Sequence, residues 1–236
     1  MKYKQYQKYK DSGIEWIGEI PEHWEVKRLK YLSKIELSTV DRHVKDDEQK
    51  VFVCHYPDVY NNEKITSSTS LNSGTCTINE IEKFRLKKDD VLITKDSETA
   101  DDIGVPTYVT DDLENTVCGY HIAQITSEKD KMFGGFLFHF IQSDLTSGYF
   151  EAFTNGITRY GMGKSVVQNL FISYPTYDEQ EQIYDFLQKE TSNFDDLISK
   201  SQSQVNLLQE KRQALINHAV TKGLDPTVPM KDSGVE

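Results

Sequence analysis

The glycine-rich stretch "GMGKS" at Gly161–Ser165 is the first place in this chain where residue types and spacing suggest a defined chemistry. A phosphate-binding loop reads G-x-x-x-x-G-K-[ST], because backbone N–H groups cradle the phosphate oxygens and the lysine neutralises them. Here Thr158 stands where the first glycine is required, and only a short segment separates Ser165 from an expected strand at Phe171. The stretch therefore predicts no nucleotide site.

No other cluster of residues has the spacing of a catalytic or metal site. The acidic stretches at 46–50 and 95–102 are typical of solvated turns beside strands, and the six histidines include no ligand pair such as H-E-x-x-H. Cys54, Cys76 and Cys118 form no close pair and are expected to be unreactive thiols. The sequence predicts no catalytic residue, no metal site and no cofactor.

The glycine-rich stretch belongs to a longer polar loop, "TNGITRYGMGKS" at 154–165, whose chemistry suits DNA. Sequence-specific recognition uses amide, hydroxyl and guanidinium groups that hydrogen bond to base edges, together with cations that contact phosphates. The loop has no acidic residue that would repel a phosphate. Its candidate contacts are Asn155, Thr158, Arg159, Tyr160 and Lys164.

A second candidate follows the apolar run "DVLIT", where the segment "TKDSET" contributes Lys95 and Ser97. Asp96 and Glu98 oppose phosphate binding in this segment. A carboxylate can nevertheless accept a hydrogen bond from the amino group of cytosine. The segment is therefore a second candidate for DNA contact, weakened for phosphate by its carboxylates.

Composition restricts how the chain can bind DNA. It has 236 residues, of which 37% are hydrophobic, and a formal net charge of −11 at pH 7. No segment reaches the ~18 apolar residues of a membrane helix, and the basic opening "MKYKQYQKYK" lacks the apolar stretch of a secretory signal, so a cytoplasmic protein is expected. Since DNA-binding proteins usually carry a basic balance, this chain must concentrate its cations locally or associate with a partner that supplies them.

The candidate residues need a scaffold, and residues 21–176 indicate one of mixed α and β structure after an amino-terminal tail at 1–20. Short β-rich runs alternate with polar loops in this region, namely "KVFVCHY", "DDVLITK", "VPTYVT" and "NLFISYP". The apolar run "KMFGGFLFHFIQS" predicts a helix, and the Ser/Thr/Asn-rich segment 63–77 predicts an exposed loop. Trp16 and Trp24 are expected to pack against the domain or the long helix rather than to stack on bases.

The region 177–223 predicts one long helix, or two in line, because no glycine or proline occurs between Pro175 and Gly223. Thr176 and Glu179 match the T-x-x-E capping box, in which the hydroxyl and the carboxylate satisfy open backbone N–H groups. Gly223 suits a left-handed cap at the other end. At 1.5 Å per residue such a helix is roughly 70 Å long.

Apolar residues repeat along this helix at alternating spacings of four and three, which is the pattern of a coiled-coil seam. The apolar seam residues include Phe194, Ile198, Val205, Leu208 and Leu215. Polar residues interrupt the seam, which argues against a long parallel zipper and favours a single antiparallel partner helix. The alternative is an ordinary amphipathic helix that lies on its own domain.

Three segments resemble the specificity subunit of type I restriction-modification systems. They are "KDSGIEWIGEIPEHWEVKRLKYL", "GITRYGMGKSVVQNLFISYPTYDEQEQIYDFL" and "LLQEKRQALINHAVTKGLDPTVPMKDSGVE", and together they cover roughly half of the chain. The most specific feature is a strand that ends in proline, then E-Q-x-x-I-x-x-F-L, then "EKRQALINHAVTKGLDP" leading into "KDSGVE". Members of this family typically contain two target-recognition domains, each followed by a long helix, as a tandem pseudo-repeat.

The resemblance implies an α+β fold in which a mixed α/β target-recognition domain at 21–176 precedes a long coiled-coil-forming helix at 177–223. The carboxyl-terminal tail at 224–236 ends on "KDSGVE", nearly a copy of the opening "KDSGIE". The expectation is a half-length specificity subunit with the start of a truncated second repeat.

By the same resemblance the chain is a non-catalytic subunit whose partners are double-stranded DNA, modification (methyltransferase) subunits and restriction subunits. The [ND]-P-P-[YF] motif of amino-methyltransferases is missing, since no two of the six prolines are adjacent. The domain would read one half of a bipartite site, and an antiparallel pair with a second copy would read a palindromic one. A different half-subunit is the other candidate partner, and a helical adaptor that binds proteins and not DNA is the alternative function.

Overall fold

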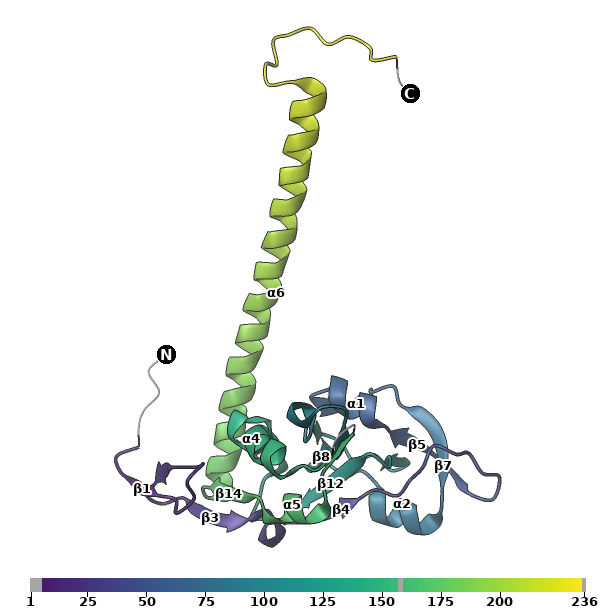
Figure 1. Cartoon of the computed structure of the whole chain (residues 1–236), viewed down its shortest axis with the longest axis vertical. Coiled ribbons are helices and arrows are strands. Elements are labelled where there is room, and N and C mark those ends of the chain that lie inside the picture. Colours follow the sequence, from purple (N-terminus) through teal and green to yellow (C-terminus); the bar gives the residue numbers. More distant parts are fainter. Residues whose placement is uncertain (1–5, 157–158, 235–236) are drawn as a thin grey trace. The chain divides into compact units, whose positions relative to one another are not determined.

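The computed structural model describes residues 6–156 and 159–234 (Figure 1). Contact clustering divides the chain into two units, Met1–Tyr184 and Asp185–Glu236. The first unit contains every strand of the described residues and both hydrophobic clusters. The second unit contains most of one long helix and the tail that follows it.

The strands follow one another along the first unit. In chain order they are β1 (Tyr9–Asp11), β2 (Glu19–Pro21), β3 (Glu25–Arg28), β4 (Ser33–Leu37), β5 (Gln49–Cys54), β6 (Lys64–Ile65), β7 (Asn72–Cys76), β8 (Asp90–Thr94), β9 (Asp96–Ser97), β10 (Pro106–Val109), β11 (Thr116–Cys118), β12 (Ile122–Ser127), β13 (Tyr160–Gly161) and β14 (Phe171–Tyr174).

The helices are shorter than ten residues except for two. They are α1 (Tyr56–Asn61), α2 (Ile78–Phe84), α3 (Gly134–Gln142), α4 (Asp144–Phe153), α5 (Lys164–Asn169) and α6 (Tyr177–Lys222), with the 3₁₀ turns η1 (Leu29–Tyr31) and η2 (Ala100–Asp102). Each of the four β-rich runs contains a strand and the predicted apolar helix is α3, so these predictions are confirmed.

A five-stranded sheet in the order β4-β12-β8-β10-β6 forms the centre of the first unit. Its neighbours are antiparallel except for the parallel pair β10 and β6. All five residues of β8 are buried, because each face of this strand meets a different hydrophobic cluster. Val91 and Ile93 pack in the cluster that includes α3, whereas Leu92 packs in the other, as the two-residue repeat of a strand requires.

A three-stranded sheet in the order β11-β5-β7 belongs to the second cluster. The expectation of an exposed loop over 63–77 is wrong at both ends of that segment, because β6 and β7 form there and bury Ile65 and Cys76. Ser, Thr and Asn are tolerated in these short strands, because the ladder hydrogen bonds come from the backbone. All three cysteines are buried free thiols, and burial raises the pKa of Cys118 to about 12.

The first turns of α6 are tied to the sheet unit. The helix begins directly after Thr176, but the Glu179 carboxylate does not complete the predicted capping box. It accepts hydrogen bonds from Tyr6 Oη (2.6 Å), His23 Nε2 (2.8 Å) and Trp24 Nε1 (3.3 Å) instead. Trp24 also meets Phe136 edge to face at a centroid separation of 6.1 Å, so its predicted packing role is confirmed.

The helix α6 runs without interruption and ends as predicted. Gly223 has a φ of 71°, and its N–H donates to the Ala219 carbonyl at 3.2 Å, which closes the left-handed cap. The apolar seam residues Phe194, Ile198, Val205, Leu208 and Leu215 are between 44% and 67% exposed. The contacts of a single chain therefore leave this seam uncovered.

Candidate functional site

The two segments that sequence analysis selected lie side by side. Strand β13 of the polar loop pairs with β9 of the second segment, with Tyr160 opposite Ser97 and Gly161 opposite Asp96. A further backbone hydrogen bond joins Met162 N to Lys95 O at 2.8 Å. Two candidates that are far apart in the sequence thus form one site, which we call the polar groove. It comprises Lys95, Asp96 and Ser97 of one segment and Asn155, Tyr160 and Gly161 of the other, with the residues that line the cavity described below.

Asn155 closes the base of the loop. Its N–H donates to the Gly161 carbonyl at 3.2 Å, and Gly161 N donates to the Asn155 carbonyl at 2.9 Å. The Thr154 hydroxyl also donates to the Gly161 carbonyl, at 3.2 Å. These backbone bonds hold the two ends of the loop together, and Thr158 lies outside the described residues.

Asp96 is the centre of the charged contacts in the groove. Its Oδ2 atom lies 3.1 Å from Lys95 Nζ and 2.8 Å from His121 Nδ1. Burial, the largest influence, raises the pKa of the Asp96 carboxyl, but the hydrogen bonds from His121 and Lys95 together hold it below its ordinary value. Lys95 also lies 4.4 Å from the centroid of the Tyr120 ring, so this ammonium group is held on two sides.

His121 connects Asp96 to Arg159. The Arg159 Nη2 atom lies 3.2 Å from His121 Nδ1 and 3.5 Å from Nε2. The His121 ring therefore contacts both the Asp96 carboxylate and the Arg159 guanidinium, and the tautomer of the ring decides which nitrogen donates and which accepts. The imidazole thereby orients an arginine whose side chain is exposed.

The cavity above these residues has a volume of about 920 Å³. Its lining includes Asp96, Ser97 and His121, and it adds Arg42, Tyr56, Tyr60, Glu98, Asp102 and Arg159. Donors, acceptors and aromatic rings therefore surround one space, which is what recognition of base edges requires. Arg42, Tyr56, Tyr60 and His121 were missed by sequence analysis, because no spacing in the chain connects them to either candidate segment.

Lys164 lies apart from the polar groove. Its ammonium group is 3.3 Å from Glu36 Oε2, an oxygen that Lys83 approaches at 3.4 Å. It lines a second cavity, of about 480 Å³, with Lys30 and Lys34. The structure therefore divides the predicted loop into one part that faces the polar groove and one that joins a cluster of lysines.

Among residues 6–156 and 159–234, no group of three or more His, Cys, Asp or Glu side chains has the geometry of a metal site. The helices in the described part of the chain include none that is long and apolar enough to cross a membrane.

The family model for the type I restriction modification DNA specificity domain matches residues 21–207 of this chain. A specificity subunit of the type I restriction enzyme MjaX from Methanocaldococcus jannaschii is 24% identical over 223 residues, which are 92% of this chain and 50% of the relative. The chain therefore spans about half the length of this curated relative.

Two solved structures share the fold. The HsdS subunit of Thermoanaerobacter tengcongensis superposes with a TM-score of 0.57 at 13% identity. The superposition covers 92% of this chain and 48% of the HsdS chain. A chain from a study of assembly and conformational transition of the type I R-M system gives a TM-score of 0.64 at 15% identity, over 87% of this chain and 47% of that one. These similarities confirm the predicted α+β fold with a long carboxyl-terminal helix.

The family match extends over the sheet unit and into α6, and its description names the selection of DNA rather than catalysis. The chain belongs to the non-catalytic family of type I restriction modification DNA specificity domains.

Proposed function

We propose that this chain selects the DNA sequence on which a type I restriction-modification assembly acts, and that its one recognition domain reads one half of a bipartite site. The observation that carries the proposal is the pairing of β9 with β13, which places Tyr160 beside Ser97, while Ser97 and Arg159 line one cavity. The site residues proposed for DNA are therefore Lys95, Ser97, Asn155, Arg159 and Tyr160 in the polar groove, with Lys164 beside the second cavity.

The net charge of −11 supports the involvement of partners. Binding to phosphates requires cations, and the cations of this chain are concentrated in a few places such as Lys30, Lys34 and Lys164. In this proposal the modification subunits supply the remaining phosphate contacts and transfer the methyl group. Restriction subunits, when they join, cleave the DNA.

The exposed seam of α6 supports a further proposal, that two copies of the chain associate through antiparallel helices. Contiguous apolar surface of this kind marks an interaction site. An antiparallel pair of identical helices has two-fold symmetry, so each copy offers the same surface to the other. Two identical recognition domains would then read identical sequences on opposite strands, which defines a palindromic site with a non-specific spacer.

The test is reconstitution of the chain with its modification subunits, followed by mapping of methylated positions in genomic DNA. The expected result is one bipartite motif with two inverted, identical halves, and light scattering of the chain alone should give the mass of a dimer at micromolar concentration. Methylation without a sequence motif would contradict the DNA-recognition proposal. A monomer, or a motif with unlike halves, would contradict self-association and favour a different half-subunit as the partner.

A further inference from the structure

We infer that Arg42 is a base-reading residue of the polar groove and that, together with Arg159, it recognises a G·C base pair by its major-groove edge. The inference rests on the proposed function, because it specifies what the groove reads. Arg42 lies in the connection between β4 and β5, far in the sequence from both segments selected for DNA contact.

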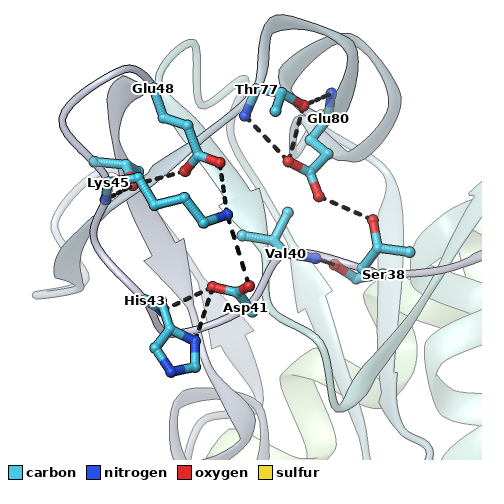
Figure 2. A network of polar contacts seen from close by, with 10 residues as sticks. Ser38, Val40, Asp41, His43, Lys45, Glu48, Thr77 and Glu80 are labelled. Atoms are coloured by element: carbon cyan, nitrogen blue, oxygen red, sulfur yellow. Dashed lines mark hydrogen bonds and ion pairs between the residues drawn. The ribbon is translucent and has the colours of Figure 1, made fainter.

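The loop that carries Arg42 is held in place from both sides of that residue (Figure 2). Asp41 Oδ1 accepts a hydrogen bond from the His43 N–H at 2.7 Å, which closes a tight turn around Arg42. The Lys45 ammonium lies 3.9 Å from Asp41 Oδ2 and 2.9 Å from Glu48 Oε1. These contacts fix the backbone on either side of the arginine.

The same loop is attached to two neighbouring elements. Lys45 N donates to the hydroxyl of buried Thr75 on β7 at 3.0 Å, and that hydroxyl donates to Glu48 Oε2 at 2.8 Å. Thr39 donates to Glu80 Oε1 on α2 at 3.0 Å. A loop anchored in this way presents its exposed side chain from a defined position, which lowers the entropy lost when that side chain binds.

Arg159, the second arginine of the lining, is also held by contacts. His121 orients Arg159 and is itself hydrogen bonded to Asp96. Tyr56 and Tyr60 on α1 stack at a centroid separation of 5.6 Å with an interplanar angle of 14° and add two rings to the lining. The side chains of Arg42 and Arg159 thus line one cavity, although they come from separate parts of the sequence.

The charges of the lining favour a base pair over a phosphate. Asp96 is already paired with Lys95 and His121, but Glu98 and Asp102 also line the cavity with the two arginines, and their carboxylates repel a phosphate group. The same carboxylates can accept a hydrogen bond from the amino group of cytosine, and a guanidinium can donate two to O6 and N7 of guanine. A G·C pair is the base pair that satisfies both kinds of group.

The test uses the reconstituted complex with the modification subunits. The variants are Arg42→Ala, Arg42→Gln and Arg159→Ala. The control is Arg85→Gln, because Arg85 is exposed and does not line the groove. Rates of methylation are measured on DNA in which each position of the mapped half-site is changed singly. Arg42→Ala should lower discrimination roughly 10- to 100-fold at one G·C position and leave the others unchanged. Arg42→Gln should shift preference there from guanine toward adenine, because glutamine pairs with the adenine edge.

Arg159→Ala should relax the same position or an adjacent one, and Arg85→Gln should leave the motif intact. Three results would overturn the inference. They are a half-site without a G·C pair, an unchanged motif in both Arg42 variants, and a uniform loss of affinity with a salt slope lower by about one. The first two results would leave the proposed function standing. Only a wild-type complex that methylates no defined sequence would remove the proposed function, and this inference with it.

Discussion

The first two turns of α6 and the later turns of the same helix differ in how their side chains are satisfied. Gln180 is fully buried, and its amide accepts from Phe133 N at 2.8 Å and donates to the carbonyls of Lys131 and Pro175 at 3.0 and 3.1 Å. By contrast, Ile198 and Leu215 are 66% and 67% exposed.

The difference assigns separate roles to two stretches that share one helical pattern. The E-Q pair of the family-like run E-Q-x-x-I-x-x-F-L is Glu179 and Gln180, and the structure uses both as hydrogen-bonding anchors. In the described part of the chain the apolar seam residues farther along remain exposed, which is why we propose a second helix for them.

The largest expected effect comes from charging the seam. The double substitution Val205→Asp and Leu208→Asp should weaken self-association more than about 1000-fold, or roughly 4 kcal/mol, because unpaired carboxylates would be buried at the interface. Light scattering should show monomers, while the unfolding of the sheet unit stays unchanged. The matched control is Ser203→Asp with Asn206→Asp, which adds the same charge away from the seam; dissociation in that control would contradict the proposed interface.

The next effect should come from the buried anchor. Gln180→Ala leaves one backbone N–H and two carbonyls without their partner, so it should lower the free energy of unfolding by about 3 kcal/mol. Gln182→Ala, an exposed glutamine in the same turn, should change it by less than about 0.5 kcal/mol. Denaturant titrations that give equal values for the two variants would refute the anchoring role.

A smaller effect, dependent on pH, is expected for Glu179. Burial, the largest influence, raises the pKa of its carboxyl, but hydrogen bonds from Tyr6, His23 and Trp24 together hold it below the ordinary value of 4.5. The stabilisation is therefore fully present above pH 4.5 and is lost as pH falls through the lower pKa of the folded state.

Accordingly, Glu179→Gln should cost about 1–2 kcal/mol at pH 7, and the difference from the unmodified chain should shrink below pH 4.5. Denaturation of both proteins across this pH range measures it. A Glu179→Gln difference that grew toward low pH would have the wrong sign and would contradict this role of the carboxylate.

The smallest effect is expected at Lys164. Its partly buried ion pair with Glu36 should contribute about 1 kcal/mol or less to folding, because the Lys164 ammonium still reaches solvent. If it contacts a phosphate as proposed, Lys164→Ala should lower the salt slope of DNA binding by about one without changing the motif. Lys83→Ala removes the other ion pair of the same carboxylate and should leave the slope unchanged, so equal slopes for the two variants would exclude the phosphate contact.

Some features of this protein follow from the sequence because their causes are local. The bounds of α6 follow from the absence of glycine and proline before Gly223, and the strand at Asp90–Thr94 follows from its run of apolar β-branched residues. Family-like runs near both ends of the chain also indicated the family to which it belongs. Local propensity and spacing suffice for such features, since neighbouring residues decide them.

Tertiary structure alone decided which of the candidate residues meet. The pairing of β9 with β13 brought Ser97 and Tyr160 together, whereas Lys164 was directed to Glu36, and no local pattern distinguishes these outcomes. Likewise, contacts between residues distant in the chain place Arg42 and His121 in the lining of the polar groove. Such contacts also let Glu179 accept a hydrogen bond from Trp24 instead of forming the predicted capping box. Such contacts depend on how separate elements pack, so the sequence alone does not predict which residues form the site.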